Sequence, residues 1–361
     1  MRIRCVRHLV TTIAVAAVAV PSALGASFGV QDDRLPHVSL DGLGARLDLI
    51  AGTGARWTRV DVVWKDIAPT KPRAPASPSD PAYRWDRLDR TIIGLARRRV
   101  RPILNIYWGP EWATGRKDQR WAPNRHQYAA FVVALGKRYS GTYQVDGMRL
   151  PRVTHFELWN EPNLDMFFRP QWIPAGPGRW RQQSPKLYAG LVRTTHHFMR
   201  RARPDALLIV GSLAPTNVSR PGGQSVGVRQ FIDALVAERI PLMAASQHIY
   251  PGAAPGASRA LPSEHGVQEI RRLWSRLRRN VPLYITETGY TSAYTPYRRY
   301  QVTEETQARY LPQLLRNLSQ PGVPVVIWYQ LEDNALWPSG LLGDGGRRKP
   351  SWNAFRAAAR R

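Results

Sequence analysis

Two glutamates stand where a run of mostly apolar residues ends. Glu161 lies in the triplet 160–162 (NEP) directly after the segment 153–159 (VTHFELW), and Glu287 lies near the end of the segment 282–288 (PLYITET). Carboxyl groups at such places can act as a general acid, a general base or a nucleophile. A helix N-terminal charge or a salt-bridge partner is the alternative for one isolated glutamate. Two strand ends of this kind in one chain favour a pair that does chemistry.

Eight short segments rich in β-branched and aromatic residues alternate with longer helical patterns. The expected strands cover residues 26–30, 56–63, 101–108, 153–159, 206–212, 243–250, 282–288 and 323–330. The expected helices cover residues 84–99, 124–139, 184–202, 228–239, 266–279 and 303–318. This alternation predicts an α/β fold, a (β/α)8 TIM barrel that forms a single catalytic domain over residues 27–361. An open doubly wound sheet is the main alternative, but the chain lacks a glycine-rich phosphate loop after its first strand.

The first 26 residues have an arginine-bearing start, an apolar run and small residues near Gly25. This pattern predicts a secretion signal peptide over residues 1–26. We therefore expect a secreted or cell-envelope protein without stable membrane insertion after signal removal; an uncleaved membrane anchor is the alternative, for which the apolar run is short. The single cysteine, Cys5, falls in the signal, so neither disulfides nor thiolate-bound metal are expected in the mature protein.

The composition is that of a globular protein, with 43% hydrophobic and 22% charged residues. The formal net charge is +26, carried mainly by arginine, and such a surface attracts polyanions. No nucleic-acid-binding signature accompanies the arginines, so we expect no nucleic-acid partner. Acidic glycans or an anionic envelope suit an exported protein better, and arginines on ordinary solvated faces are the alternative.

The motifs FELWNEPN and YITETGY resemble the strand-four and strand-seven motifs of clan A glycoside hydrolases, the group that contains families 5 and 39. The resemblance covers the whole chain after the signal. It implies that Glu161 is the general acid/base and Glu287 the nucleophile, and that neither a metal nor another cofactor is needed. It also implies substrate-binding roles for Arg59 beside the nucleophile, Asn160 on the sugar 2-hydroxyl, His248 on the sugar or a carboxylate, Tyr250 as a donor to the nucleophile, and Trp328 as an aromatic platform under the sugar.

Cleavage of a glycosidic bond with retention requires one carboxylate to attack the anomeric carbon and another to protonate the departing oxygen, with the two about 5 to 5.5 Å apart. Arg59 and Tyr250 should favour the ionised form of Glu287, whereas Glu161 should keep its proton near neutral pH. We predict a monomeric, retaining O-glycosyl hydrolase of a β-linked polysaccharide or oligosaccharide. A non-catalytic glycan-binding barrel and a hydrolase or transglycosylase of an acidic envelope exopolysaccharide are the alternatives.

Further charged and aromatic residues lie near the same ends of the strands. Glu157 is expected to be a buried support paired with an arginine or a hydroxyl. A solvated position is expected for Glu111, Asp165, Glu332 and Asp333. The loops after the third and fourth strands carry Trp108, Trp112, Trp121, Phe167, Phe168, Trp172 and Trp180. These rings could line an open cleft for internal cleavage, line a pocket for terminal cleavage, or fill a small core beneath the loops.

Overall fold

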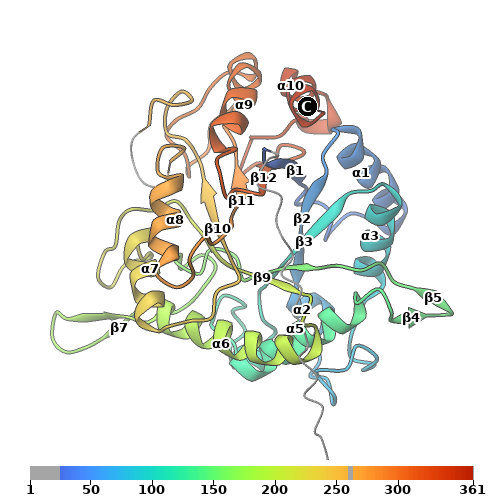
Figure 1. Ribbon diagram of the computed structural model, residues 1–361, viewed down its shortest axis with the longest axis vertical. Helices are drawn as coiled ribbons and strands as arrows, with labels where there is room; N and C mark the ends of the chain where they lie inside the picture. The colour runs from blue at the N-terminus through green and yellow to red at the C-terminus, as the bar shows by residue number, and fades with distance from the viewer. Residues whose placement is uncertain (1–24, 259–262, 361) are drawn as a thin grey trace, which may run out of the picture.

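Eight parallel strands close into a barrel in the computed structural model, which describes residues 25–258 and 263–360 (Figure 1). The strands are β1 (Ser27–Gln31), β2 (Trp57–Val63), β3 (Arg101–Tyr107), β6 (His155–Leu158), β9 (Leu207–Leu213), β10 (Ala244–Ile249), β11 (Leu283–Thr288) and β12 (Val325–Tyr329). Their order around the barrel is β1-β12-β11-β10-β9-β6-β3-β2. The predicted TIM barrel and its eight strands are thus confirmed. Residues 1–24, which make up most of the predicted signal, lie outside the described part of the chain.

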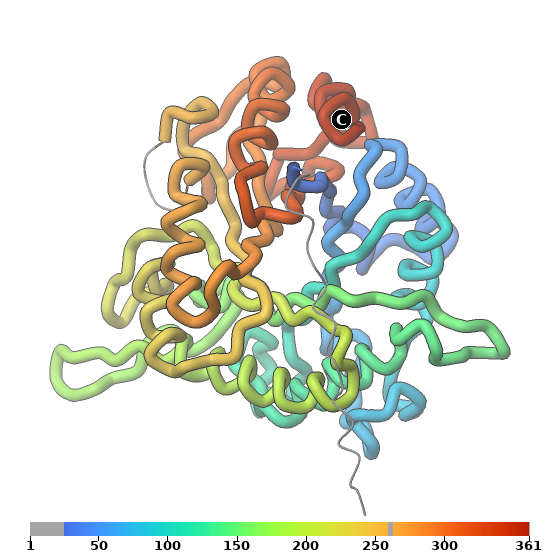
Figure 2. The backbone as a smooth tube through the Cα atoms, viewed as in Figure 1, coloured from blue at the N-terminus to red at the C-terminus, as the bar shows by residue number. Residues whose placement is uncertain are grey.

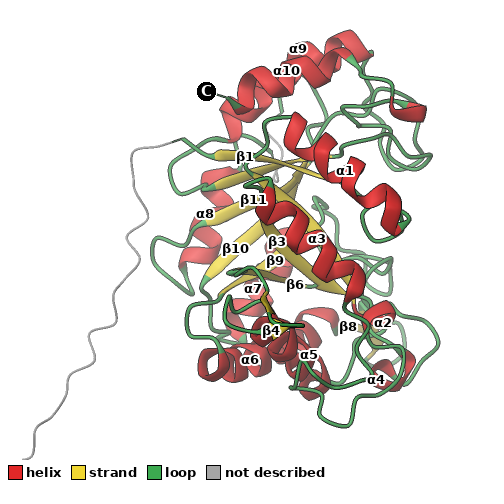
Figure 3. Cartoon of the chain, turned by 90° about the vertical axis from the view of Figure 1, so that its right-hand side faces the viewer, coloured by secondary structure: helices red, strands yellow, loops and turns green. Residues whose placement is uncertain are grey.

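Helices cover the outside of the barrel (Figures 1 and 3). They are α1 (Leu40–Gly52), α2 (Trp64–Ile67), α3 (Asp86–Arg97), α4 (Glu111–Thr114), α5 (Arg125–Arg138), α6 (Ser184–Ala202), α7 (Val228–Ala237), α8 (Val267–Ser275), α9 (Glu304–Leu318) and α10 (Pro350–Ala359), and a 3₁₀ turn covers Asp344–Gly346. All six predicted helices are present, whereas α1, α2, α4 and α10 were not predicted. The caps follow the sequence: Asn124 accepts hydrogen bonds from the amides of His126 and Gln127 at the start of α5.

Alternate residues of each strand point into the barrel, and this period of two divides the interior into layers. The lower interior is an apolar cluster of Trp57, Ile103, Ile209, Ala244, Tyr284, Val325 and Ile327. His155 lies between two of these rings. Its ring centroid is 4.7 Å from that of Trp57, and its Nε2 is 3.1 Å from the Tyr284 hydroxyl oxygen. The outward residues of the same strands, such as Val326, pack against the helices.

The chain runs once around the ring, so that its first and last strands meet (Figure 2). β1 pairs with β12 over five residues, from Ser27 with Val325 to Gln31 with Tyr329. Gly29 permits this closure, because a Cβ there would lie 2.4 Å from the Ile327 side chain and 2.6 Å from the Trp57 carbonyl oxygen.

Two hairpins project from the barrel on opposite sides (Figures 1 and 2). They are β4 (Gln144–Val145) with β5 (Met148–Arg149), and β7 (Trp172–Pro174) with β8 (Trp180–Gln182). Among the described helices, none combines the length and apolar character needed to span a bilayer.

Candidate active site

The end of β6 is shaped by the residues around Glu161. Trp159 and Glu161 adopt positive φ angles of 71° and 41°, a backbone conformation that residues other than glycine rarely adopt. The Asn163 side chain holds the loop in place: its Nδ2 donates to the carbonyl oxygens of Ala214 and Val226, and its Oδ1 accepts from the Ala214 amide at 2.9 Å. Strained backbone that is fixed in this way is common at functional sites, where it aims a particular side chain.

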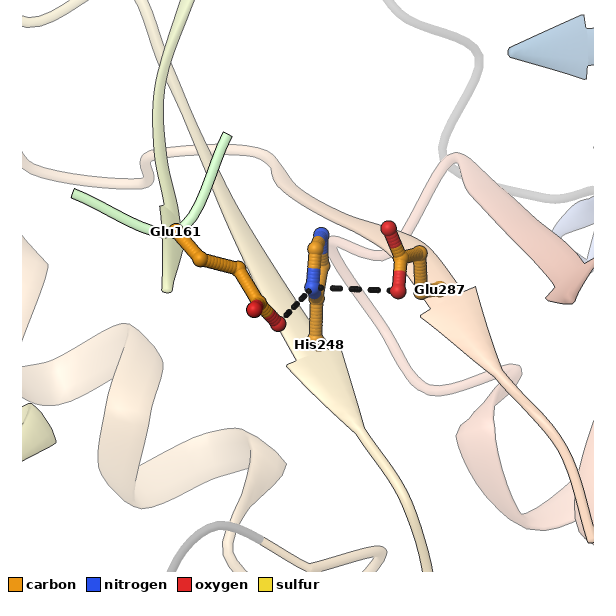
Figure 4. Close-up of side chains that lie close together, drawn as sticks. All are labelled: Glu161, His248 and Glu287. Carbon is orange, nitrogen blue, oxygen red and sulfur yellow. Dashed lines mark hydrogen bonds and ion pairs between the residues drawn. The ribbon is translucent and has the colours of Figure 1, made fainter. Parts of the chain in front are cut away.

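Register shifts in β10 and β11 direct two further side chains to the same place. β10 shifts against β11 between Gln247 and His248, and β11 shifts against β12 between Ile285 and Thr288. Such irregularities change where a strand aims its side chains. As a result one carboxylate oxygen of Glu161, one ring nitrogen of His248 and one carboxylate oxygen of Glu287 all lie within 4.8 Å of one another (Figure 4).

Arg59 on β2 organises the centre through all five of its N–H groups. Its Nε donates to Glu157 Oε2 at 2.6 Å, Nη1 to Glu287 Oε1 at 2.7 Å, and Nη2 to Asn160 Oδ1 at 2.7 Å. The remaining two bonds reach Gln31 Oε1 and Ser212 Oγ, both at 3.0 Å. Burial lowers the pKa of Arg59, but the charges of Glu157 and Glu287 raise it further, so the guanidinium stays charged. The expected support role of Glu157 is confirmed, since this carboxylate is fully buried on Arg59.

Glu287 and Glu161 have different partners. The Tyr250 hydroxyl donates to Glu287 Oε2 at 2.6 Å, which completes an arginine–carboxylate–tyrosine arrangement. His248 Nδ1 lies 2.7 Å from Glu161 Oε1 and 3.3 Å from Glu287 Oε2, and its Nε2 lies 3.0 Å from Ser212 Oγ. His248 is fully buried, and its contacts with Glu161 and Glu287 agree with the expected carboxylate contact. The Asn160 oxygen bonds to Arg59, and its amide nitrogen has no hydrogen-bond partner in the part of the chain that the structure describes.

Burial raises the pKa of both glutamates, and their different partners decide which of the two ionises first. The pKa of Glu161 rises well above its ordinary value through burial and through the charge of Glu287. The pKa of Glu287 rises to about 8 because burial outweighs the opposing effects of Arg59 and the Tyr250 hydrogen bond. Arg59 and Tyr250 therefore make Glu287 the first of the two to ionise, as expected, but burial shifts its titration upward more than the sequence indicated. Burial also lowers the pKa of His248 well below its usual value, so the ring is neutral.

The spacing of Glu161, His248 and Glu287 would also fit ligands of a metal ion. Two contacts disfavour this assignment. Arg59 places a permanent positive charge 2.7 Å from Glu287 Oε1, and the Tyr250 hydroxyl occupies the other oxygen of the same carboxylate. A second cation in this place would be repelled. The arrangement suits two carboxyl groups that share protons.

The prediction for Trp328 is wrong. Val325 and Ile327 point into the lower interior, so Trp328 points outward; its ring is fully buried and its Nε1 donates to the Ser339 carbonyl oxygen at 2.9 Å. The inward position belongs to Tyr329, which is half-buried and bonds to the Asp33 carboxylate. The all-apolar segment VVIWY does not reveal its own parity, which explains the error.

The structure also adds an aromatic residue that the sequence did not indicate. Trp337, in the loop after β12, contacts Tyr250 edge-on with ring centroids 4.9 Å apart and lies beside Tyr297 at 6.4 Å. Of the predicted loop aromatics, Trp108 and Phe167 are half-buried and stack at 6.4 Å. Others serve packing or lie away from the centre: Phe168 is fully buried, Trp112 donates to Ala68, Trp172 donates to Ser225, Trp121 lies near Arg116, and Trp180 is exposed on the β7–β8 hairpin.

Two of the four carboxylates expected to be solvated are in fact held in ion pairs, with Glu332 buried and Asp333 half-buried. Glu332 bonds to Arg46 and Arg34, and Asp333 lies 3.0 Å from Lys349 Nζ. Their cationic partners are distant in sequence, so no local pattern predicted them. Asp165 pairs with Arg169 at 2.6 Å, and Glu111 is exposed as expected.

The fold is that of clan A glycoside hydrolases, as the two motifs predicted. A family 39 glycoside hydrolase from Xanthomonas axonopodis pv. citri superposes with a TM-score of 0.61 at 19% identity, covering 92% of this chain and 65% of that enzyme. A family 39 β-xylosidase from Caulobacter crescentus gives 0.63 at 18% identity, covering 93% and 72%. A family 5, subfamily 18 protein from Streptomyces cattleya in complex with GlcNAc gives 0.63 at 17% identity, covering 93% and 80%.

Sequence comparison also finds a similar protein. A β-xylosidase of Geobacillus stearothermophilus is 23% identical over 238 residues, which cover 60% of this chain and 42% of that enzyme. The chain thus spans less than half the length of this curated relative. No protein-family model matches the sequence.

Proposed function

We propose that this protein is a retaining β-glycoside hydrolase in which Glu287 is the nucleophile and Glu161 the general acid/base. The observation that carries the proposal is the Glu161–Glu287 pair, whose nearest oxygens lie within 4.8 Å at the mouth of a barrel. Retaining enzymes hold their carboxyl groups about 5 to 5.5 Å apart, and inverting ones about 6.5 to 9.5 Å apart. The fold shared with family 39 and family 5 enzymes supports the same chemistry.

The contacts assign a role to each group in two steps. An oxygen of ionised Glu287 attacks the anomeric carbon while the glycosidic C–O bond breaks, and the Glu161 proton passes to the departing oxygen. The glycosyl ester on Glu287 removes the negative charge that had raised the pKa of Glu161, so Glu161 then accepts a proton from water as the water attacks the same carbon. Neutral His248, hydrogen-bonded to Glu161 and lying beside Ser212, is a positioning residue for the acid.

The test is glycoside turnover by the parent protein beside Glu161→Ala, Glu287→Ala and the exposed control Glu305→Ala. We expect release of reducing sugar from at least one β-glycan by the parent and Glu305→Ala, and loss of turnover in the other two. Proton NMR of the first product should show the β-anomer. An α-anomer as first product would contradict retention, and equal activity in all four proteins would remove both residues from the mechanism.

Azide separates the two roles. In Glu287→Ala the anion fills the space of the lost carboxylate and attacks the sugar directly, which gives an α-glycosyl azide from an activated substrate. In Glu161→Ala it attacks the ester on Glu287 from the opposite side and gives a β-glycosyl azide. Exchanged products would reverse the two assignments.

We also propose export to the cell envelope or beyond it, supported by the N-terminal sequence pattern. Mass spectrometry of the protein from its source should find a mature N-terminus near residue 26. An intact N-terminus on cytosolic protein would contradict export.

A further inference from the structure

A second pair of carboxylates, Asp33 and Asp61, lies at the barrel mouth beside the catalytic pair. Asp33 follows β1, and Asp61 lies on β2 with the same inward parity as Arg59. Both are only half-buried. Gln31 Nε2 joins them, donating to Asp33 Oδ1 at 2.9 Å and to Asp61 Oδ2 at 3.4 Å. Burial, together with the charge of Asp61, raises the pKa of Asp33 to about 7, so the two charges are close enough to interact.

One side chain connects this pair to the nucleophile. Gln31 Oε1 accepts from Arg59 Nη1 at 3.0 Å, and the same Nη1 donates to Glu287 Oε1. Tyr329 bonds to Asp33 and stands beside Tyr250, whose hydroxyl holds Glu287. The Asp33–Asp61 pair therefore lies on the Glu287 side of the centre, where the sugar unit that becomes attached to the nucleophile must sit.

A buried acceptor at the same place lacks a partner. Asn105 is only 1% exposed, and its Nδ2 donates to Asp61 Oδ1 at 3.0 Å. Its Oδ1 has no hydrogen-bond partner within the described residues. Unpartnered buried acceptors are unusual in folded proteins and call for a donor. Together with the two carboxylates, this amide oxygen offers acceptors to a ligand that brings hydroxyl groups.

Among the described residues, the neighbouring cations bond to other groups or lie outside the barrel. The five N–H groups of Arg59 each have an acceptor in the protein, which is the full capacity of a guanidinium. Arg46 is bonded to Asp32 and Glu332. Arg298 lies 5.1 Å from the Tyr250 ring and donates to the Pro251 carbonyl oxygen. Arg84 and Arg87 line a recess that Val60 and Asp61 also line, but the Asp61 carboxylate oxygens bond to Asn105 and Gln31 inside the barrel. A carboxylate on the bound sugar would thus face carboxylates without a free cation among these groups.

We propose that the Asp33–Asp61 pair, with Asn105, accepts hydrogen bonds from neighbouring hydroxyls of the sugar unit held beside Glu287, so that this unit is a neutral sugar and not a uronic acid. The inference rests on the proposed glycosidase function and narrows its substrate class. The excess of basic residues, +26 over the full sequence, can then attract an anionic polymer or envelope outside the cleaved unit.

The first test uses matched aryl β-glycosides that differ only in CH2OH or carboxylate at the same carbon: glucoside with glucuronide, and galactoside with galacturonide. Repulsion between like charges should favour the neutral member by at least about 100-fold in kcat/KM. Asp33→Asn and Asp61→Asn should each lower kcat/KM on the neutral member by about 10- to 100-fold, mainly through KM. Each should also reduce the preference for the neutral glycoside over its uronide partner. The exposed control Asp48→Asn should change neither. A uronide cleaved as fast as its neutral partner would overturn the inference while leaving the glycosidase function intact.

The second test separates direct contact from a structural effect and does not need turnover. Binding is measured by calorimetry in the Glu161→Gln background for a series of the preferred glycoside in which each member lacks one hydroxyl. One member of this series should bind equally well with and without the additional substitution Asp61→Asn. The same titrations should show neutral glycosides binding and uronides failing to bind. Additive losses across the whole series, or absence of binding by every neutral glycoside, would overturn the inference. An enzyme inactive on every glycoside that still binds neutral ones would instead overturn the proposed catalysis.

Discussion

The lower and upper halves of the barrel interior are built by the same strands and have opposite chemistry. The lower half is the apolar cluster of Trp57, Ile103, Ile209, Ala244, Tyr284, Val325 and Ile327. The upper half places the carboxylates of Asp33, Asp61, Glu157, Glu161 and Glu287 around the guanidinium of Arg59. Trp57 in the lower half and Arg59 in the upper half are only two residues apart along β2. Burial therefore stabilises the fold below, whereas above it costs free energy and shifts the pKa values that the chemistry requires.

The strongest way to break this division is to remove its central cation. Arg59→Met leaves Glu157 and Glu287 buried without a counter-charge, and we expect a loss of about 3–5 kcal/mol in unfolding free energy. Turnover should fall by at least roughly 10³-fold, since the nucleophile also loses the charge that favours its ionisation. Denaturant titration and kinetics on the best substrate measure both. Arg56→Met, at the exposed residue just before the same strand, is the control, and retained activity in Arg59→Met would contradict the role of Arg59.

A cavity in the lower half should affect stability alone. Ile327→Ala is expected to cost about 2–5 kcal/mol and Ile327→Val about 0.5–1.5 kcal/mol, because the rigid strands cannot collapse onto the space. The kcat of the folded protein should remain at the parent value. A kcat that falls in step with stability would show that the two halves are coupled.

The upper half should impose an unusual pH profile. Since Glu287 must be ionised and its pKa is raised to about 8 by burial, kcat/KM should fall as pH decreases through a range well above the ordinary carboxyl value of 4.5. Tyr250→Phe removes a hydrogen bond that lowers this pKa, so the acid limb should move to higher pH and the rate should drop about 10- to 100-fold. Rates measured from pH 4 to 10 give both limbs. An acid limb near 4.5 in the parent would contradict the burial effect.

The free-energy cost of burying a charged Glu161 should also appear in the thermal stability of the protein. The raised pKa of Glu161 means that the folded protein binds this proton more tightly than the unfolded chain, so its contribution is present below about pH 4.5 and is lost as pH rises toward the folded pKa. Glu161→Gln cannot ionise and should melt above the parent at pH 8, where each 1 kcal/mol corresponds to roughly 2–4 °C. The difference should vanish at pH 4. Calorimetry at both pH values, with Glu305→Gln as control, measures the difference in melting temperature. A difference that grew at low pH would contradict the assignment.

The smallest expected contrast is between two adjacent aromatic residues. Tyr329→Phe loses the hydrogen bond to Asp33 on the inner face and should raise KM about 3- to 10-fold with a small change in kcat. Trp328→Phe alters packing on the outer face and should lower stability by about 1–3 kcal/mol without a change in KM. Steady-state kinetics and thermal melts on both variants suffice. Reversed effects would mean that the parity of β12 is misassigned.

The sequence predicted the barrel and the carboxylate pair because both have local signals. Each strand and long helix has its own periodicity, and Glu161 and Glu287 stand at strand ends inside recognisable motifs. The roles of Asp33, Asp61 and Tyr329 depend instead on which face of β1, β2 and β12 points inward and on the pairing that closes the barrel. The ion pairs of Glu332 and Asp333 depend on Arg46 and Lys349, which no local pattern connects to them.

The pairing of β1 with β12 has a consequence for when the centre can exist. Asp33 and Gln31 come from the first strand region and Tyr329 from the last, almost 300 residues away, and they meet only when the ring closes. A chain growing on a ribosome cannot assemble this set until residue 329 has emerged. Fragments that lack either strand leave an open sheet edge and a divided pocket. Competence for chemistry is therefore acquired only after β12 has been synthesised, and translation products that stop before it should be inert.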